Sequence, residues 1–193
     1  FYLCGAKGTT GSLWIQQSDS RFEQLPQQDI SKDAEKEEVD ALFFDADADG
    51  DQDLYVVSGG NENEGKLLQD RLYINSSGQF KSSPLPKNWE SGSCVVAADY
   101  DSDGDLDLFV GTRGVPGRYP ESAPSQLLAN LGEGSFEIAN EKMPNQNNLG
   151  NITDALWEDI NFDTKPDLVV VGEWMPITIL YQQQNAFTAS TNA

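Results

Sequence analysis

The chain carries one acidic loop, Asp45-Ala46-Asp47-Ala48-Asp49-Gly50-Asp51-Gln52-Asp53-Leu54, in three copies. The second is Asp99-Tyr100-Asp101-Ser102-Asp103-Gly104-Asp105-Leu106-Asp107-Leu108, and a less regular third is Asp159-Ile160-Asn161-Phe162-Asp163-Thr164-Lys165-Pro166-Asp167-Leu168. Five carboxylates in nine residues, as in the first two copies, repel one another and need a counter-charge. A hard divalent cation with oxygen ligands meets that need, and calcium, which takes about six to eight oxygens at flexible geometry, fits best.

The pattern D-x-D-x-D-G-x-x-D assigns a ligand role to each position. Side chains at positions 1, 3, 5 and 9 converge, position 7 offers its backbone carbonyl, and glycine at position 6 permits the positive φ that curls the backbone round the ion. The expected ligands of the first loop are Asp45, Asp47, Asp49, Asp53 and the carbonyl of Asp51. Those of the second are Asp99, Asp101, Asp103, Asp107 and the carbonyl of Asp105. We expect Ca²⁺ in both loops, against the alternative of solvated acidic turns.

The third loop departs from the pattern at two positions. Asn161 replaces the acid at position 3 and Thr164 replaces the glycine, which leaves three carboxylates. We expect a weaker calcium site, and its ligands would be Asp159, Asn161, Asp163, Asp167 and the carbonyl of Lys165. The alternative is a turn held by Asp and Asn hydrogen bonds to its own backbone.

The loops recur at steps of 54 and 60 residues, which indicates a supersecondary repeat. Each unit has an apolar run before the loop, a β-branched or aromatic run after it, and a third run. A fourth run begins at Phe80, Phe136 or Phe187. Strand-forming flanks and Val56, Val110 and Val170 at position 12 exclude an EF-hand, which needs helices and a bidentate Glu there. Four short strands per unit predict an all-β fold of four-stranded antiparallel blades, a β-propeller.

The expected organisation is a single propeller region over 1–193, with a partial blade at 1–36 and blades at 37–90, 91–150 and 151–193. This amounts to about three and three-quarter blades, a fragment whose open edge could pair with another copy. The charged segment 32–38 is interpreted as a solvated connector. Cys4 and Cys94 stand in apolar runs and are expected to be buried free thiols, with a disulfide as the alternative.

Composition excludes several kinds of function. The formal charge is −20, from 32 acidic and 12 basic residues, and thirteen of the acids lie in the three loops. Three calcium ions would leave about −14, which argues against binding nucleic acid or anionic membranes. No apolar run approaches the length of about eighteen residues that a helix needs to span a bilayer. The chain has no histidine and only two scattered cysteines, which excludes a zinc site or a Cys/His nucleophile.

Several stretches resemble a known repeat class. The loops with their following strands resemble FG-GAP/VCBS repeats of integrin α propellers. The segments 108–120, 154–157 and 171–176, which include Val-Pro-Gly-Arg-Tyr-Pro and Gly-Glu-Trp-Met-Pro, look like the ASPIC/UnbV (cartilage acidic protein-like) group. The resemblance implies a calcium-binding propeller, commonly seven-bladed, on secreted or surface proteins that bind partners rather than catalyse. Millimolar calcium outside cells agrees with an extracellular, cell-surface or periplasmic location.

The resemblance also implies that ligands approach the face opposite the metal loops. Arg113, Arg118, Tyr119 and Trp174 would stand there, where Arg and aromatic side chains suit protein or glycan recognition. Alternatively, Tyr119 and Trp174 pack only their own loops. We expect a recognition or adhesion module and not an enzyme. A propeller hydrolase or lyase with catalytic residues partly elsewhere, and a purely structural assembly domain, remain as alternatives.

Overall fold

The computed structural model describes residues 1–184 and 186–191 and is built almost entirely of strands. Its fifteen strands form four antiparallel sheets, the first with three strands and the others with four. The all-β prediction is confirmed, and so are blades of four strands for the second, third and fourth sheets. Helical structure in the described residues is limited to four 3-10 turns, at Ile30–Lys32, Gly65–Leu68, Asn140–Lys142 and Pro144–Asn147.

The strands follow the chain in order within each sheet. The first sheet contains β1 (Tyr2–Leu3), β2 (Ser12–Gln16) and β3 (Phe22–Leu25). The second contains β4 (Glu38–Phe44), β5 (Asp53–Ser58), β6 (Arg71–Ser76) and β7 (Gln79–Ser83). The third contains β8 (Ser91–Ala98), β9 (Asp107–Gly114), β10 (Gln126–Asn130) and β11 (Phe136–Ile138). The fourth contains β12 (Asn151–Glu158), β13 (Asp167–Glu173), β14 (Thr178–Gln183) and β15 (Ala186–Thr191).

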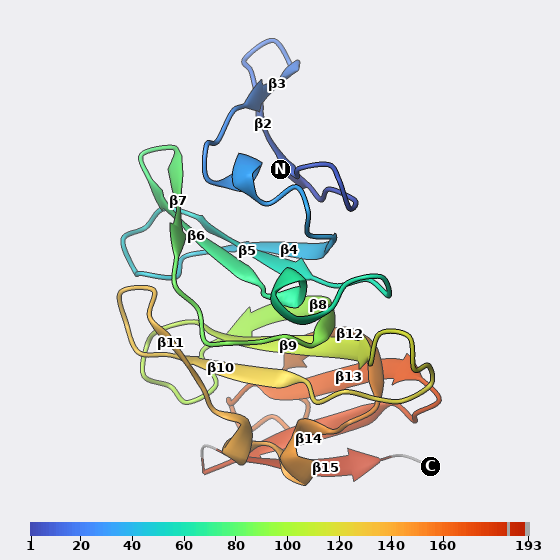
Figure 1. The fold of residues 1–193 in the computed structure, drawn as a ribbon. Helices are drawn as coiled ribbons and strands as arrows, with labels where there is room; N and C mark the ends of the chain where they lie inside the picture. Colours follow the sequence, from blue (N-terminus) through green and yellow to red (C-terminus); the bar gives the residue numbers. More distant parts are fainter. Residues whose placement is uncertain (185, 192–193) are drawn as a thin grey trace.

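Within each sheet, strands that are consecutive in sequence pair with each other, so each four-stranded sheet is a simple meander. The four sheets succeed one another from the N-terminus to the C-terminus as stacked blades (Figure 1). Because the strands run antiparallel, the acidic loops after β4, β8 and β12 lie at one end of the blades. The connections from second to third strands lie at the other end, toward the right in Figure 1.

In the second and third sheets, the second strands β5 and β9 are buried on both faces along most of their length, which explains their continuous apolar sequence. In β5, Leu54 and Val56 pack toward the first sheet, and Tyr55 and Val57 pack toward the third. All four side chains are at most 1% exposed. Alternate residues of one strand therefore serve two neighbouring hydrophobic cores.

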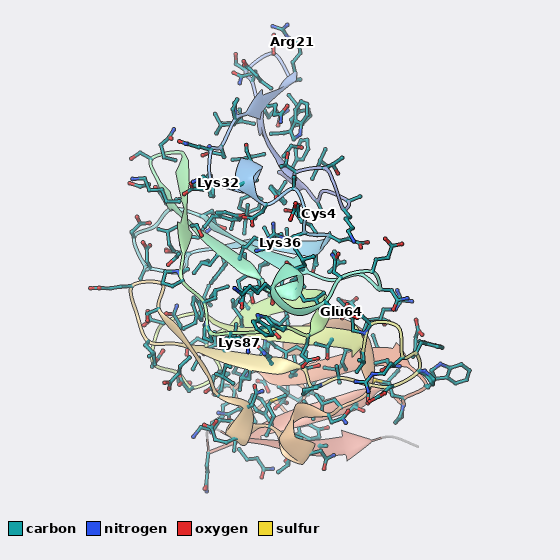
Figure 2. All side chains as sticks on the ribbon, in the orientation of Figure 1. Cys4, Arg21, Lys32, Lys36, Glu64 and Lys87 are labelled. Atoms are coloured by element: carbon teal, nitrogen blue, oxygen red, sulfur yellow. The ribbon has the colours of Figure 1, made fainter. Side chains whose placement is uncertain are left out.

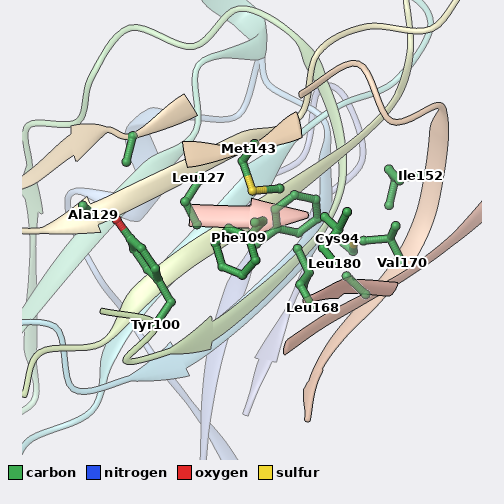
Figure 3. Close-up of a cluster of buried hydrophobic side chains, with 13 residues drawn as sticks. Cys94, Tyr100, Phe109, Leu127, Ala129, Met143, Ile152, Leu168, Val170 and Leu180 are labelled. Atoms are coloured by element: carbon green, nitrogen blue, oxygen red, sulfur yellow. The ribbon is translucent and has the colours of Figure 1, made fainter. Parts of the chain in front are cut away.

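Three such cores lie between the four sheets. The largest joins the third and fourth sheets and includes Phe109, Leu127, Ile152 and Leu168 (Figure 3). Since burying a large apolar side chain stabilises a fold by about 1.5 to 3 kcal/mol, these cores hold the blades together.

Two expectations about buried and exposed residues are wrong. Cys4 is exposed, near the first sheet in Figure 2, because β1 begins the smaller sheet and little packs over it; Cys94 is buried as expected, and both thiols are free. Glu38, counted with the solvated connector, belongs to β4 and is buried, where its carboxylate pairs with Arg71. Within the described residues, no helix has the length and apolarity to cross a membrane.

Candidate metal centres

Each acidic loop turns between the first and second strands of its blade with the same backbone shape. Position 4 has left-handed φ in all three loops, at 60° for Ala48, 64° for Ser102 and 62° for Phe162. Position 6 is also left-handed, at 91° for Gly50 and 101° for Gly104. Two left-handed residues in one short turn curl the chain so that the acidic side chains point inward.

The carboxylate at position 1 closes the turn from within. Oδ2 of Asp45 accepts the backbone N–H of Gly50 at 3.0 Å, and Oδ2 of Asp99 accepts that of Gly104 at 3.1 Å. Asp159 accepts the N–H of Thr164 at 2.8 Å, so the third loop has the same closure although it lacks the glycine. The backbone arrangement is therefore shared by all three copies.

The carboxylate at position 9 ties the loop to the third strand and is fully buried in Asp53, Asp107 and Asp167. One oxygen accepts the N–H of position 2, and the other accepts an N–H from the third strand. In the first loop these bonds come from Ala46 at 2.7 Å and Asn75 at 2.7 Å. The corresponding pairs are Tyr100 and Asn130 in the second loop, and Ile160 and Gln182 in the third.

Carboxylate oxygens gather in the first two loops. Ligand atoms of Asp45, Asp47 and Asp49 lie within 4.8 Å of one another, and so do those of Asp99, Asp101 and Asp107. In these groups, Oδ1 of Asp45, Asp47 and Asp101 is buried and has no hydrogen-bond partner. A buried carboxylate oxygen without a partner is costly, which fits a position that a cation would fill.

The pKa values reflect this crowding. Desolvation raises the pKa of Asp47, and the charges of Asp49 and Asp45 raise it further. Desolvation raises the pKa of Asp101 as well, and the charges of Asp103 and Asp99 raise it further. Burial raises the pKa of Asp107 to about 7, against the lowering effect of its two backbone hydrogen bonds. A divalent cation would offset this desolvation and repulsion together.

Other predicted ligands lie in the loops but outside these close groups. Asp53 and Asp103 are such residues: Asp53 is fixed by two backbone N–H groups, and Asp103 accepts the N–H of Asp105 at 3.0 Å. Asp51 accepts the N–H of Ser77 through its side chain at 3.3 Å, and its predicted role concerns only its carbonyl.

The third loop gathers fewer carboxylates. Among the described residues, Asp159, Asp163 and Asp167 do not form a close acidic group. The Asn161 amide donates to Asp163 at 3.1 Å, and Asp163 accepts the N–H of Lys165 at 3.0 Å. Local hydrogen bonds of this kind are what the alternative of an Asx-type turn requires.

Sequence reasoning missed an amide residue at the end of each third strand. These residues are Asn75, Asn130 and Gln182, whose backbone N–H groups bond to the position 9 carboxylates. Their side chains also donate to loop carbonyls, at 3.2 Å from Asn75 to Gln52 and 2.8 Å from Asn130 to Ala46. An amide residue recurring after each apolar third run was the signal that could have revealed them.

The opposite end of the blades carries the predicted ligand-face residues. Arg113 forms an ion pair with Glu173 at 2.6 Å, and this hydrogen bond lowers the pKa of the Glu173 carboxyl. Tyr119 is 62% exposed and Trp174 is 84% exposed, and the Trp174 indole donates to the Tyr119 hydroxyl. Arg118 pairs with Glu121 at 3.3 Å within its own loop.

A groove of about 600 Å³ lies beside these residues. Arg113 and Tyr119 line it, together with Asn61, Ser93 and Thr153 from three neighbouring blades. Arg118 and Trp174 are not among its lining residues. Tyr119 and Trp174 are both exposed and contact each other across two connections, so neither ring is packed inside its own loop.

Successive four-stranded meanders with an acidic loop between the first two strands define a β-propeller-type repeat protein. Residues 45–110 match the family model described as FG-GAP-like repeat. The match runs from the first Asp of the first loop into β9, so it covers one loop, the rest of that blade and the next loop. The segment that is similar to this family makes up about one third of the chain. A search of curated proteins found no match to the chain.

Proposed function

We propose that this chain is a calcium-binding propeller module of an exported protein, in which the ions stiffen the acidic loops. The observation that carries the proposal is the set of buried, unpartnered carboxylate oxygens on Asp45, Asp47 and Asp101. The candidate ligand atoms of both close acidic groups are carboxylate oxygens, the ligand type that calcium prefers, and the described residues contain no histidine. The first two loops bind strongly and the third binds more weakly.

The calcium ions would have a structural role, which is to stabilise the folded state, and not a catalytic one. An empty loop keeps its carboxylates apart by repulsion, and a filled loop holds them together, so ion binding favours the folded state. At a hundredfold excess of calcium over Kd, each site adds about 2.7 kcal/mol to the free energy of unfolding. The calcium concentration outside cells would keep such sites filled, which supports an extracellular, cell-surface or periplasmic location.

Thermal melting with calcium and with a chelator tests this role. Calcium should raise Tm in the wild-type protein, and the rise should shrink when Asp47→Asn and Asp49→Asn disable the first loop. The matched control is Glu62→Gln with Glu64→Gln, which removes two exposed acids from a connection at the opposite end. A Tm that is indifferent to chelation would refute a structural role for calcium.

We further propose that the opposite face binds a protein or a glycan. Exposed Trp174 and Tyr119 beside a polar groove support this, because aromatic side chains on a rigid scaffold are efficient contacts for both kinds of partner. The likeness to the ASPIC/UnbV group agrees with a binding role. The net charge of −20 disfavours nucleic acid and anionic membranes as partners.

A glycan array separates the remaining alternatives. Binding that is lost in Trp174→Ala and Tyr119→Ala would support recognition, and turnover of a bound glycan would favour a hydrolase or lyase instead. If binding is absent from both a glycan array and a panel of extracellular proteins, a purely structural assembly domain is favoured. In that case, self-association through an open sheet edge should appear as a concentration-dependent oligomer.

A further inference from the structure

A single buried amide contacts the first and second acidic loops together. Asn130, at the end of β10, is 2% exposed. Its Nδ2 donates to the carbonyl of Ala46 at 2.8 Å and to the carbonyl of Leu106 at 3.2 Å. Ala46 is position 2 of the first loop and Leu106 is position 8 of the second, so the amide bridges two candidate metal sites in neighbouring blades.

The other polar groups of Asn130 fix it in place. Its backbone N–H donates to Oδ1 of Asp107 at 2.9 Å, and its Oδ1 accepts the N–H of Gly132 at 3.0 Å. The N–H of Gly134 in the following turn also donates to the Ala46 carbonyl, at 3.1 Å. Two donors from the third sheet therefore hold one carbonyl of the first loop.

The Ala46 carbonyl is a sensitive point of contact. Ala46 lies between Asp45 and Asp47, and its N–H donates to Asp53 at 2.7 Å. The direction of its carbonyl therefore depends on whether the first loop is closed. On the other side of the bridge, Asn130 bonds directly to Asp107, which belongs to the close acidic group of the second loop.

We propose that Asn130 couples the two sites, so that calcium in either loop raises the affinity of the other. An ion in the first loop orders the Ala46 carbonyl, which holds the Asn130 amide and with it the N–H that positions Asp107. Binding of the first ion costs conformational entropy because it orders this bridge. The second ion binds to a loop that is already ordered, and its binding therefore costs less. By linkage the effect is reciprocal. This inference rests on the proposed calcium function.

The repeat supplies a second bridge and a matched control. Gln182 donates to the Tyr100 carbonyl, position 2 of the second loop, at 3.0 Å and bonds through its N–H to Asp167 of the third. Asn75 occupies the equivalent place in the second sheet, and within the described residues its amide bonds to Gln52 and Gly78 of its own blade. Replacing Asn75 therefore perturbs one loop without cutting a bridge between loops.

Calorimetric titration of the full chain with calcium tests the coupling. Throughout, Asp159→Asn and Asp163→Asn disable the third loop, so that only two sites remain. The affinity of the second site is compared with the first loop intact and with it disabled by Asp47→Asn and Asp49→Asn. We expect disabling the first loop to weaken the second site by roughly fivefold or more.

In Asn130→Ala, disabling the first loop should change the affinity of the second site by less than about twofold. In Asn75→Ala, disabling the first loop should still weaken the second site by roughly fivefold or more. Hydrogen exchange of the Gly134 amide gives a readout independent of affinity: it should slow when the first loop is filled. If Asn130→Ala does not fold, Asn130→Ser replaces it, and the comparison with Asn130 intact still tests the coupling.

The outcomes separate the two proposals. If neither loop binds calcium, the proposed function fails. If both bind but the affinity of the second site is the same with the first loop intact or disabled, the coupling is wrong and the calcium function stands. Coupling that survives in Asn130→Ala at full strength would also overturn the role of Asn130.

Discussion

Arg71 donates a hydrogen bond to Glu38 at 2.8 Å in a part of the protein where the two side chains are only 4% and 2% exposed. The Glu38 carboxylate also accepts the Tyr2 hydroxyl at 2.9 Å and the Gly5 N–H at 2.7 Å. Arg71 reaches the Ser58 hydroxyl at 3.2 Å. The ion pair therefore links the first sheet and its connection to three strands of the second.

Arg71→Met should strongly destabilise the protein. It leaves the Glu38 carboxylate buried without its counter-charge, and breaking a buried pair in this way costs about 3 to 5 kcal/mol. The double variant Glu38→Gln with Arg71→Met should recover much of that loss, because no buried charge remains. Urea unfolding in the presence of a chelator measures the free energy of unfolding without a contribution from metal.

An exposed ion pair provides the control for that measurement. Arg21 pairs with Asp19 with side chains 83% and 48% exposed, so Arg21→Met should leave the unfolding midpoint essentially unchanged. Equal destabilisation by the two arginine substitutions would mean that burial does not determine the value of the Arg71 pair.

Gly50→Ala and Gly104→Ala should each lower the free energy of unfolding by about 1 kcal/mol through backbone strain alone. Both glycines have positive φ, at 91° and 101°, and a Cβ at either position would have no heavy atom within 4 Å. Steric clash is therefore not a factor. Urea unfolding of calcium-free protein measures the loss, and an unchanged value would show that the loops relax without cost.

Thr164→Gly is the inverse experiment in the third loop. Thr164 has a φ of 71°, a conformation that disfavours a β-branched residue, so glycine should stabilise calcium-free protein by up to about 1 kcal/mol. Thr164→Ser is the matched control, since it keeps a side chain and should gain much less. A gain of equal size in both variants would assign the effect to the lost methyl group.

The third loop should become a stronger calcium site when its two departures are reversed. Asn161→Asp restores a fourth carboxylate and Thr164→Gly restores the turn residue, and calcium affinity rises with ligand charge and with fit of the loop. We expect the double variant to bind at least tenfold tighter than the wild-type loop in calorimetry, with the first two loops disabled. No gain would indicate that the third loop is only a hydrogen-bonded turn.

The blades could be predicted because the same order of apolar runs and acidic loop recurs in the sequence of each blade. The apolar run of β5 and the loop beginning at Asp45 follow from residue type and spacing, and these local preferences agree with the packing between sheets. Glu38 was misassigned because its burial depends on Arg71, 33 residues away, which a charged local sequence does not reveal.

The acidic loops could be located from the sequence, but the grouping of their carboxylates could not. The pattern treats position 9 as one more ligand, and it does not reveal that both oxygens of Asp53 also accept backbone N–H groups, from Ala46 and Asn75. The bridge from Asn130 to Ala46 joins residues 84 positions apart, so it depends on how neighbouring blades pack.

Because of Asp70, the free energy of unfolding should fall as pH rises from 3.8 to about 6. Its buried carboxylate accepts the Ser58 N–H at 2.7 Å, the Tyr55 hydroxyl at 3.0 Å and the Asn88 amide at 3.1 Å. Burial outweighs these bonds and raises its pKa from 3.8 to about 6. The folded state therefore holds a proton that the unfolded state has already released between these values, and its contribution to stability is lost above about pH 6.

Asp70→Asn isolates this effect because the amide does not titrate. From pH 4 to pH 7, the free energy of unfolding of the wild-type protein should fall relative to the variant by up to about 3 kcal/mol, the equivalent of the pKa difference. Urea unfolding of both proteins at each pH, with a chelator present, measures the difference. A difference between the two proteins that stays constant across this range would mean that burial does not raise the pKa of Asp70 in the folded state.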